Sequence, residues 1–370
     1  MKTARIFISS LVVVVSSFAA YAQQGMKETV GQYCLIGSSL NQRQSDGLDA
    51  AASAIVRTHF NTAVAENCMK SGPLQPEEGR FDFRAADNFV DYCEQNGLKA
   101  IGHCLVWHSQ APGWFFKGKD GQQVTREELI KRIKAHIHTV VGRYKGRIHG
   151  WDVVNEAIED NGTFRKSPFY NIIGEEFIDI AFQAAHEADP DAELYYNDYS
   201  MSQKGKCETT CKLVKHLKEK GLRIDGVGMQ SHNGLDYPNV DEYEKSLLAF
   251  ADCGVKVMIT ELDFNVLPNP KGFGGAAVEQ NFDYQKKYNP YTNGLPKDKA
   301  KELNERIFEF FKIYYRHRDK ISRINLWGIS DANSWLNGWP VPGRTNYPLL
   351  FDRDYKAKPV VEDIIKLYSK

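Results

Sequence analysis

The chain has 370 residues, of which 42% are hydrophobic and 12% aromatic, so it is long and apolar enough to bury a large core. Its 47 basic and 47 acidic residues give a formal net charge of zero. This balance favours neither nucleic acid nor an anionic membrane surface as a partner. For the oligomeric state, a monomer is the default expectation.

The first 22 residues have the pattern of a cleavable secretory signal peptide. Lys2 and Arg5 precede an apolar run that is too short to span a bilayer, and Ala20-Tyr21-Ala22 fits a small-x-small cleavage site. We therefore expect secretion to the periplasm or the medium, with residues 23–370 as the mature domain. A buried N-terminal helix is the alternative. Export would permit disulfides, but seven cysteines leave at least one thiol unpaired within the chain.

Short apolar runs then alternate with longer amphipathic ones. The expected strands are Leu35–Leu40, Thr62–Glu66, Lys99–Trp107, Ile148–Glu156, Glu193–Asn197, Gly226–Ser231, Lys256–Glu261 and Ile324–Trp327. The expected helices are Gly47–His59, Arg84–Asn96, Thr125–Tyr144, Glu175–Ala188, Glu208–Lys220, Asp241–Cys253, Lys299–His317 and Pro359–Tyr368. Eight strands that are each followed by a helix predict an α/β protein with a single (β/α)8 TIM barrel.

Polar residues concentrate where these strands end. The segments finish in "VAEN", "GHCLVWH", "DVVNE", "YYNDY", "GMQSH", "ITELD" and "LWGISD". In a barrel of this kind, the C-terminal ends of the strands carry the active site. The sequence therefore predicts a polar site at that face.

Two glutamates stand out in these segments. Glu156 ends the fourth strand and Glu261 the seventh, so the two side chains can face each other across the mouth of the barrel. Paired carboxyls are the minimum equipment for glycoside hydrolysis, in which one protonates the leaving oxygen and the other attacks or activates water. Separate surface salt bridges are the alternative. Asn155 precedes Glu156, and both can serve one site only if the strand ends or bulges there.

Aromatic and histidine residues near the strand ends bear on the choice of substrate. Indole rings pack against the C–H faces of sugars, whereas Trp151 suits the core. Three histidines leave a metal-dependent hydrolase open, yet the sequence has no H-E-x-x-H motif. We favour hydrogen bonding to a carboxylate, above all for His232 and Gln230. The residues considered are Trp107, Trp327, Trp335 and Trp339, with His103, His108 and His232.

Together these segments resemble glycoside hydrolase family 10, the β-1,4-xylanases. The similar stretches, in family order, are "AENCMK", "GHCLVWHSQ", "WDVVNEA", "YYNDY", "GMQSH", "ITELDF" and "LWGISDANSW". The resemblance runs over the mature chain, from "LIGSSLN" to "LLFDRDYKAKP". It implies a single (β/α)8 barrel that hydrolyses internal bonds of xylan with retention, with xylan or xylo-oligosaccharides as substrate and without a cofactor or metal.

The resemblance also assigns residue roles. Glu156 matches the acid/base and Glu261 the nucleophile, so their carboxyls are expected about 5 to 5.5 Å apart. The residues implied to support the nucleophile are His232, Asp263, Asn155 and Gln230. The implied sugar contacts are Glu66, Asn67, Lys70, His103, Trp107, Trp327 and Trp335, together with position 198 in "YYNDY".

The sequence departs from the family pattern in three places. Ser71-Gly72-Pro73 follows Lys70 where an aromatic residue is common, and Leu336 stands where an arginine is frequent. The long stretch Val266–Pro296 is expected to shape the leaving-group side. Three alternatives remain: the same fold acting on another β-1,4 glycan or on aryl glycosides, a carbohydrate-binding protein that has lost catalysis, and a metal-dependent hydrolase.

Overall fold

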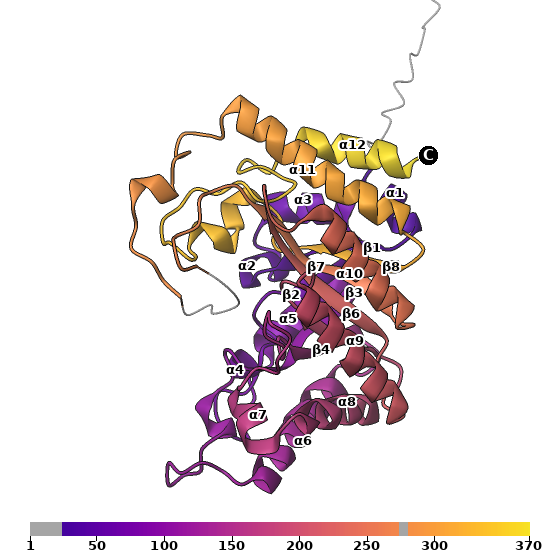
Figure 1. The fold of residues 1–370 in the computed structure, drawn as a ribbon, viewed down its shortest axis with the longest axis vertical. Coiled ribbons are helices and arrows are strands. Elements are labelled where there is room, and N and C mark those ends of the chain that lie inside the picture. Colours follow the sequence, from indigo (N-terminus) through magenta and orange to yellow (C-terminus); the bar gives the residue numbers. More distant parts are fainter. Residues whose placement is uncertain (1–23, 274–279) are drawn as a thin grey trace, which may run out of the picture.

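The computed structural model describes residues 24–273 and 280–370 (Figure 1). Its centre is a closed barrel in which each strand pairs in parallel with the next along the chain, and the last strand pairs with the first. This topology confirms the predicted (β/α)8 fold. The strands are β1 Leu35–Leu40, β2 Thr62–Ala65, β3 Lys99–Trp107, β4 Ile148–Asn155, β5 Glu193–Asp198, β6 Gly226–Gly234, β7 Lys256–Asn265 and β8 Ile321–Leu326.

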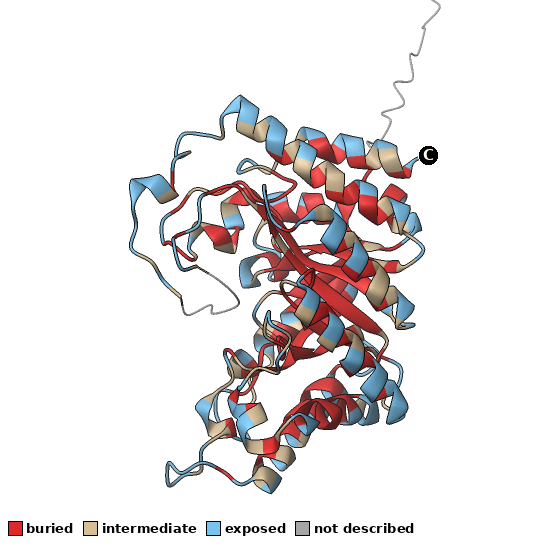
Figure 2. Cartoon of the chain, in the orientation of Figure 1, coloured by how far each residue is buried: buried red, intermediate tan, exposed pale blue. Residues whose placement is uncertain are grey.

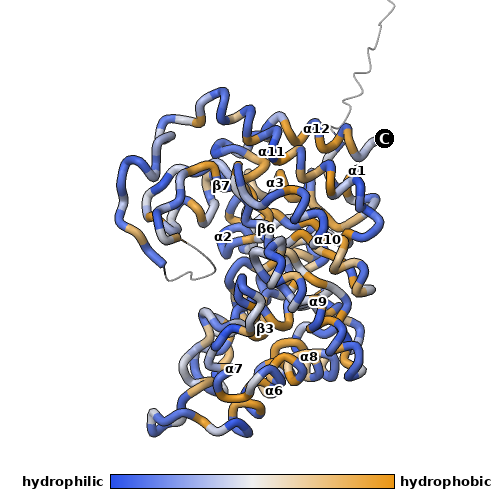
Figure 3. The backbone as a smooth tube through the Cα atoms, viewed as in Figure 1, coloured by the Kyte–Doolittle hydropathy of each residue, from blue (hydrophilic) through white to orange (hydrophobic). Residues whose placement is uncertain are grey.

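Helices surround the strands and cover the outside of the barrel (Figure 1). Their apolar faces turn toward the strands, which are buried almost throughout, while their charged faces meet solvent (Figures 2 and 3). Within the described residues, no helix is long and apolar enough to cross a membrane. The helices are α1 Met26–Thr29, α2 Gln42–Ser45, α3 Ala50–His59, α4 Ser71–Leu74, α5 Arg84–Gln95, α6 Arg126–Arg143, α7 Pro168–Ile173, α8 Glu176–Ala188, α9 Lys204–Glu219, α10 Val240–Asp252, α11 Lys297–Arg316 and α12 Pro359–Tyr368.

The two ends of the described chain meet beside the barrel. Helix α1 contacts α12, and α12 packs along α11 (Figure 1). The signal peptide predicted at residues 1–22 lies outside the described residues, so export stays a prediction. All seven cysteines are free thiols.

Two strands continue past the point where the sequence pattern ends them. We expected β6 to end at Ser231 and β7 at Glu261, but they extend to Gly234 and Asn265. Their pairing shifts register between Gln230 and His232, so β7 carries an extra residue beside Glu261. A bulge of this kind re-aims a side chain without ending the strand.

The core contains one close approach that the sequence explains. Trp151 on β4 is fully buried, as expected for a core residue, and its indole lies against Gly102 of β3. A Cβ atom at position 102 would lie 2.0 Å from the Trp151 ring, a separation at which atoms overlap. Glycine is therefore required at this position, because any side chain would displace the tryptophan.

Gly102→Ala is expected to destabilise the protein by about 1–3 kcal/mol or more, the usual cost of overpacking a core. Urea denaturation of the purified variant measures this loss. Gly142→Ala on α6 is the matched control, since a Cβ there has nothing within 4 Å and alanine favours the helix. An unchanged free energy of unfolding for Gly102→Ala would contradict the packing described here.

Candidate active site

A cleft of about 1020 Å³ opens at the C-terminal ends of the strands. It brings together side chains from strands and loops that are far apart in the sequence, as the barrel fold predicts. The predicted site residues that line it are Glu66, Asn67, Lys70, His103, Trp107, Asn155, Glu156, Gln230, His232, Glu261, Asp263, Trp327 and Trp335.

Glu156 enters the cleft because β4 ends immediately before it. The β4–β5 pairing shifts register between Asp152 and Val154, and the strand ends at Asn155. Glu156 then has φ = 58°, a left-handed conformation that non-glycine residues rarely adopt. Its backbone N–H donates to Asn197 O at 2.9 Å. The expectation that the strand ends or bulges at this point is confirmed.

Glu261 reaches the cleft by a different local route. It lies within β7, at the bulge opposite β6, and its φ is 56°. Backbone in this region costs on the order of 1–3 kcal/mol per residue and is found most often at functional sites. Both glutamates are thus turned into the same cleft by strained backbone, although the two strands lie on different sides of the barrel.

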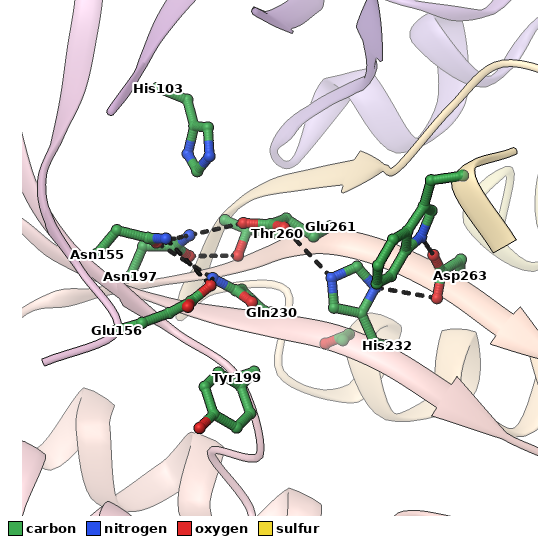
Figure 4. A network of polar contacts seen from close by, with 12 residues as sticks. His103, Asn155, Glu156, Asn197, Tyr199, Gln230, His232, Thr260, Glu261 and Asp263 are labelled. Atoms are coloured by element: carbon green, nitrogen blue, oxygen red, sulfur yellow. Dashed lines mark hydrogen bonds and ion pairs between the residues drawn. The ribbon is translucent and has the colours of Figure 1, made fainter. Parts of the chain in front are cut away.

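Three donors hold the Glu156 carboxylate. Trp107 Nε1 donates to Oε2 at 2.8 Å, whereas Asn155 Nδ2 and Gln230 Nε2 each donate to Oε1 at 3.1 Å. The resemblance had assigned Asn155 and Gln230 to the support of Glu261. Their direct carboxylate partner is Glu156, and Figure 4 shows both amides on its side of the network.

A third amide, that of Asn197, links Glu261 to Asn155 and so to Glu156. Asn197 Nδ2 donates to Glu261 Oε1 at 2.8 Å and to Asn155 Oδ1 at 2.9 Å, while Thr260 Oγ1 donates to Asn197 Oδ1 at 2.6 Å (Figure 4). Asn197 and Thr260 were not among the predicted site residues. The signal for Asn197 was present in "YYNDY", but the contact was assigned to the neighbouring position.

That assignment to position 198 is wrong. Residue 198 is Asp198, which is fully buried, does not line the cleft and binds Lys206 at 3.0 Å. Successive residues of a strand face opposite sides, so only one of Asn197 and Asp198 can face the cleft. Asn197 is the one whose side chain reaches the site, because it contacts Glu261 directly.

On the other side of Glu261, a histidine bridges two carboxylates. His232 Nε2 lies 3.2 Å from Glu261 Oε2, and Nδ1 lies 3.1 Å from Asp263 Oδ1. Trp335 Nε1 donates to the second Asp263 oxygen at 2.8 Å. Burial alone would lower the pKa of His232, but Asp263 and Glu261 outweigh it and raise the pKa to about 10. His232 is therefore a cation beside Glu261 at neutral pH.

The two glutamates differ in proton affinity for identifiable reasons. Burial, with the neighbouring charges of Asp198 and Glu261, raises the pKa of Glu156 to about 7. Burial also acts to raise the pKa of Glu261, but the hydrogen bond from His232, the nearby imidazoles and the amide of Asn197 lower it below its usual value. At a pH between the pKa values of the two glutamates, Glu156 is protonated and Glu261 is ionised. An acid and a nucleophile need these two protonation states.

The remaining polar side chains form one end of the cleft. Lys70 Nζ donates to Asn67 Oδ1 at 2.8 Å and lies 4.9 Å from the centre of the Trp107 ring, while burial raises the pKa of neighbouring Glu66. His103 Nδ1 lies 2.9 Å from Asp152 Oδ2. These groups present hydrogen-bonding partners of the kind that sugar hydroxyls need.

A stacked tryptophan pair also lines the cleft. Trp335 and Trp339 lie 4.5 Å apart at 15°, and Phe273 meets Trp339 edge-on at 5.1 Å. Trp339 was among the tryptophans considered in the sequence for packing against sugars, and it lines the cleft. The first part of the Val266–Pro296 stretch also lines it, whereas residues 274–279 lie outside the described residues.

The histidines do not form a metal-binding group. In residues 24–273 and 280–370, no three His, Cys, Asp or Glu side chains are arranged to hold a metal ion. His103 and His232 are instead bound to carboxylates. The donor sets of this cleft are suited to hydrogen bonding and proton transfer.

Two glutamates in one cleft at the strand ends of the barrel, one with a raised and one with a lowered pKa, are the pair of carboxyls that glycoside hydrolases use. Comparison with known proteins narrows this class. The family model of glycosyl hydrolase family 10 matches residues 25–367. The chain therefore belongs to glycosyl hydrolase family 10.

Individual relatives agree with this assignment. The chain is 55% identical over 363 residues to endo-1,4-beta-xylanase A of Xylanibacter ruminicola, covering 98% of both chains. It is 38% identical over 343 residues to a beta-1,4-xylanase of Dictyoglomus thermophilum, covering 92% of this chain and 90% of the relative. Among solved structures, a GH10 endoxylanase retrieved from a sugarcane soil metagenome has a TM-score of 0.89 at 46% identity, covering 93% of this chain and all of that one.

Proposed function

We propose that the protein is a retaining endo-1,4-β-xylanase, with Glu156 as acid/base and Glu261 as nucleophile. The observation that carries this proposal is the opposite direction in which one cleft shifts the pKa of its two buried glutamates. The relatives named as xylanases support xylan as the substrate. A polymeric substrate also agrees with the export predicted from residues 1–22.

In the first step, the Glu261 carboxylate attacks the anomeric carbon while Glu156 gives its proton to the glycosidic oxygen. The C–O bond breaks, the leaving chain departs as an alcohol, and the sugar becomes an ester of Glu261. His232 is the cation beside Glu261 and keeps this carboxylate ionised before attack. Trp107 and Gln230 hold the Glu156 carboxyl in place for the transfer.

In the second step, the ionised Glu156 takes a proton from water, which attacks the same carbon and releases Glu261. The switch from acid to base follows from the charges. The Glu261 charge helps to raise the pKa of Glu156, and ester formation removes that charge. The pKa of Glu156 therefore falls at the stage where Glu156 must be ionised to act as a base.

The pH dependence of kcat/KM is expected to be bell-shaped. Glu156 must be protonated, so activity falls as the pH rises through its pKa of about 7. Glu261 must be ionised, and its pKa lies below the usual value of 4.5, so activity falls only at more acidic pH. Initial rates on soluble xylan across this range, with stability checked at each pH, measure both limbs. A basic limb above pH 9 would contradict the assignment of Glu156.

The test of the function is reducing-sugar release from linear β-1,4-xylan in the presence of a chelator, with β-1,4-glucan in parallel. We expect hydrolysis of xylan, a rapid fall in viscosity that indicates internal cleavage, and little release from glucan. Loss of activity with chelator would favour a metal-dependent hydrolase. Binding to xylan without cleavage would favour a carbohydrate-binding protein. Faster cleavage of β-1,4-glucan than of xylan would make glucan the substrate instead of xylan.

A further inference from the structure

A group of charged and aromatic residues lies next to the turn that carries Glu156, and the mechanism above does not use it. Two of its members, Asp160 and Tyr199, reach the cleft. The group joins the end of β5, the loop after β4 and the first turn of α9. We call it the Asp198 cluster, and its members are Asp198, Tyr196, Tyr199, Lys206, Asp160 and Arg165.

Asp198 is fully buried and its carboxylate is surrounded by donors. Lys206 Nζ and the backbone N–H of Tyr199 donate to Oδ1 at 3.0 and 2.9 Å. The backbone N–H of Ile158, at 3.3 Å, and the Tyr196 hydroxyl donate to Oδ2. Burial raises the pKa of Asp198, and the Lys206 cation and the hydrogen bonds from its donors act against this rise.

Lys206 is the cation of the cluster and is also fully buried. Its Nζ lies 3.0 Å from Asp198 and 3.2 Å from Asp160, whose side chain is 46% exposed at the cleft. It also lies 3.5 Å from the centre of the Tyr199 ring, a cation–π contact. The two carboxylates raise the pKa of Lys206 despite its burial, so the ammonium is retained.

The cluster holds the strained turn that carries Glu156. Arg165 Nε donates to the backbone carbonyl of Glu156 at 2.9 Å, and Arg165 Nη2 donates to the Tyr199 hydroxyl at 2.7 Å. The next two backbone N–H groups, of Ala157 and Ile158, donate to the Tyr196 hydroxyl and to Asp198. Three consecutive residues of the turn are thus bound to the cluster.

The cluster also sets the charge next to Glu156. The carboxylate of Asp198 favours the neutral form of Glu156, and Lys206 partly offsets it. Cys104 on β3 and His108, which follows that strand, stay neutral, because burial raises the pKa of the first and lowers that of the second to about 3. The titratable and charged groups around the Asp198–Lys206 pair are His108, Asp160, Arg165, Tyr196 and Tyr199, with Glu159 next to Arg165. Cys104 and Glu261 face Glu156 instead.

We propose that Asp198 and Lys206 are positioning residues that fix the Glu156 turn and hold the proton on its carboxyl, and thereby set the pH above which the enzyme loses activity. The inference rests on the proposed function, because it assigns Glu156 as the acid. It extends that function by naming a buried ion pair, outside the cleft, as the element that sets the alkaline limit.

The decisive variant is Asp198→Asn, which preserves the shape of the side chain and removes its charge. The basic limb of the kcat/KM profile is expected to move to lower pH by about one unit, the size of effect that one nearby charge exerts in a partly buried site. Activity near pH 5 should be reduced less than activity at pH 7.

Asp160→Asn is a milder variant, because the side chain is half exposed and its loss does not threaten the fold. It leaves Lys206 less neutralised, so the basic limb should move in the same direction by a few tenths of a unit. If Asp198→Asn does not fold, this variant decides the question. Circular dichroism and urea denaturation establish which variants are folded.

Asp331→Asn is the matched control. Asp331 is another fully buried aspartate, and it pairs with Lys358 at 2.9 Å in the segment after β8. It should lose stability as Asp198→Asn does but leave the basic limb at the wild-type pH. The proposal is overturned if folded Asp198→Asn and Asp160→Asn keep the wild-type limb, or if Asp331→Asn shifts it equally. Failure of the proposed function itself would show separately, as wild-type protein that does not cleave xylan.

Discussion

Glu261→Gln is expected to lower kcat on xylan by at least about 10⁴-fold, the largest effect of any single substitution in this cleft. Glutamine keeps the size of the side chain, and its one amide oxygen can accept from only one of the two donors that bind Glu261, Asn197 at 2.8 Å and His232 at 3.2 Å. It removes the negative charge and the nucleophilic oxygen. The variant should therefore fold and bind xylan but form no glycosyl-enzyme.

The measurement is the initial rate of reducing-sugar release, with circular dichroism and binding to insoluble xylan as checks on folding and substrate affinity. Glu362→Gln on α12 is the matched control, because that glutamate is exposed and pairs with Lys366 on the surface. A folded Glu261→Gln protein that kept a tenth of the wild-type rate would rule out Glu261 as the nucleophile.

Glu156→Gln is expected to show a loss that depends on the leaving group. Xylan leaves as a poor alcohol that needs a proton, so its cleavage should fall by about 10²–10⁴-fold. A dinitrophenyl β-xylobioside releases an acidic phenol that needs no proton, so its first step should be nearly unaffected. The second step still lacks its base, and the glycosyl-enzyme should accumulate.

Rapid mixing with the dinitrophenyl substrate is the measurement, and it should show a burst of one phenol per enzyme followed by slow turnover. Added azide is a nucleophile that needs no general base, and it should raise the slow rate and yield a glycosyl azide. Glu261→Gln under the same conditions should give neither burst nor azide rescue. Equal losses on both substrates, without a burst, would contradict the acid/base role of Glu156.

Much of the fold was predictable because alternation of strands and helices is a local property of the sequence. Leu35–Leu40 and Lys99–Trp107 have the bounds that the pattern predicted. The extension of β7 to Asn265 was not predictable, since it depends on a bulge opposite Ser231. A bulge is a relation between two strands, and the sequence of one strand does not specify it.

The residues of the site were likewise predictable where the local sequence marks them and not where they depend on contacts between strands. Glu156 and Glu261 could be found because each ends an apolar run, and the structure places both in one cleft. Asn197 and Thr260 were missed because their importance lies in contacts between β5 and β7, 63 residues apart in the chain. To choose between Asn197 and Asp198, one must know which of the two side chains points toward the site. Two adjacent polar residues in a strand do not reveal this.

The positive φ at Glu156 and Glu261 has a consequence for the evolution of this protein. Glycine adopts a positive φ without penalty and asparagine with little. Selection for stability alone would therefore replace the glutamates at both positions. A laboratory selection for heat resistance that ignored activity would drift toward glycine or asparagine at residues 156 and 261. The persistence of glutamate at both positions in a parallel library that is also selected for activity would therefore measure the pressure to keep the chemistry.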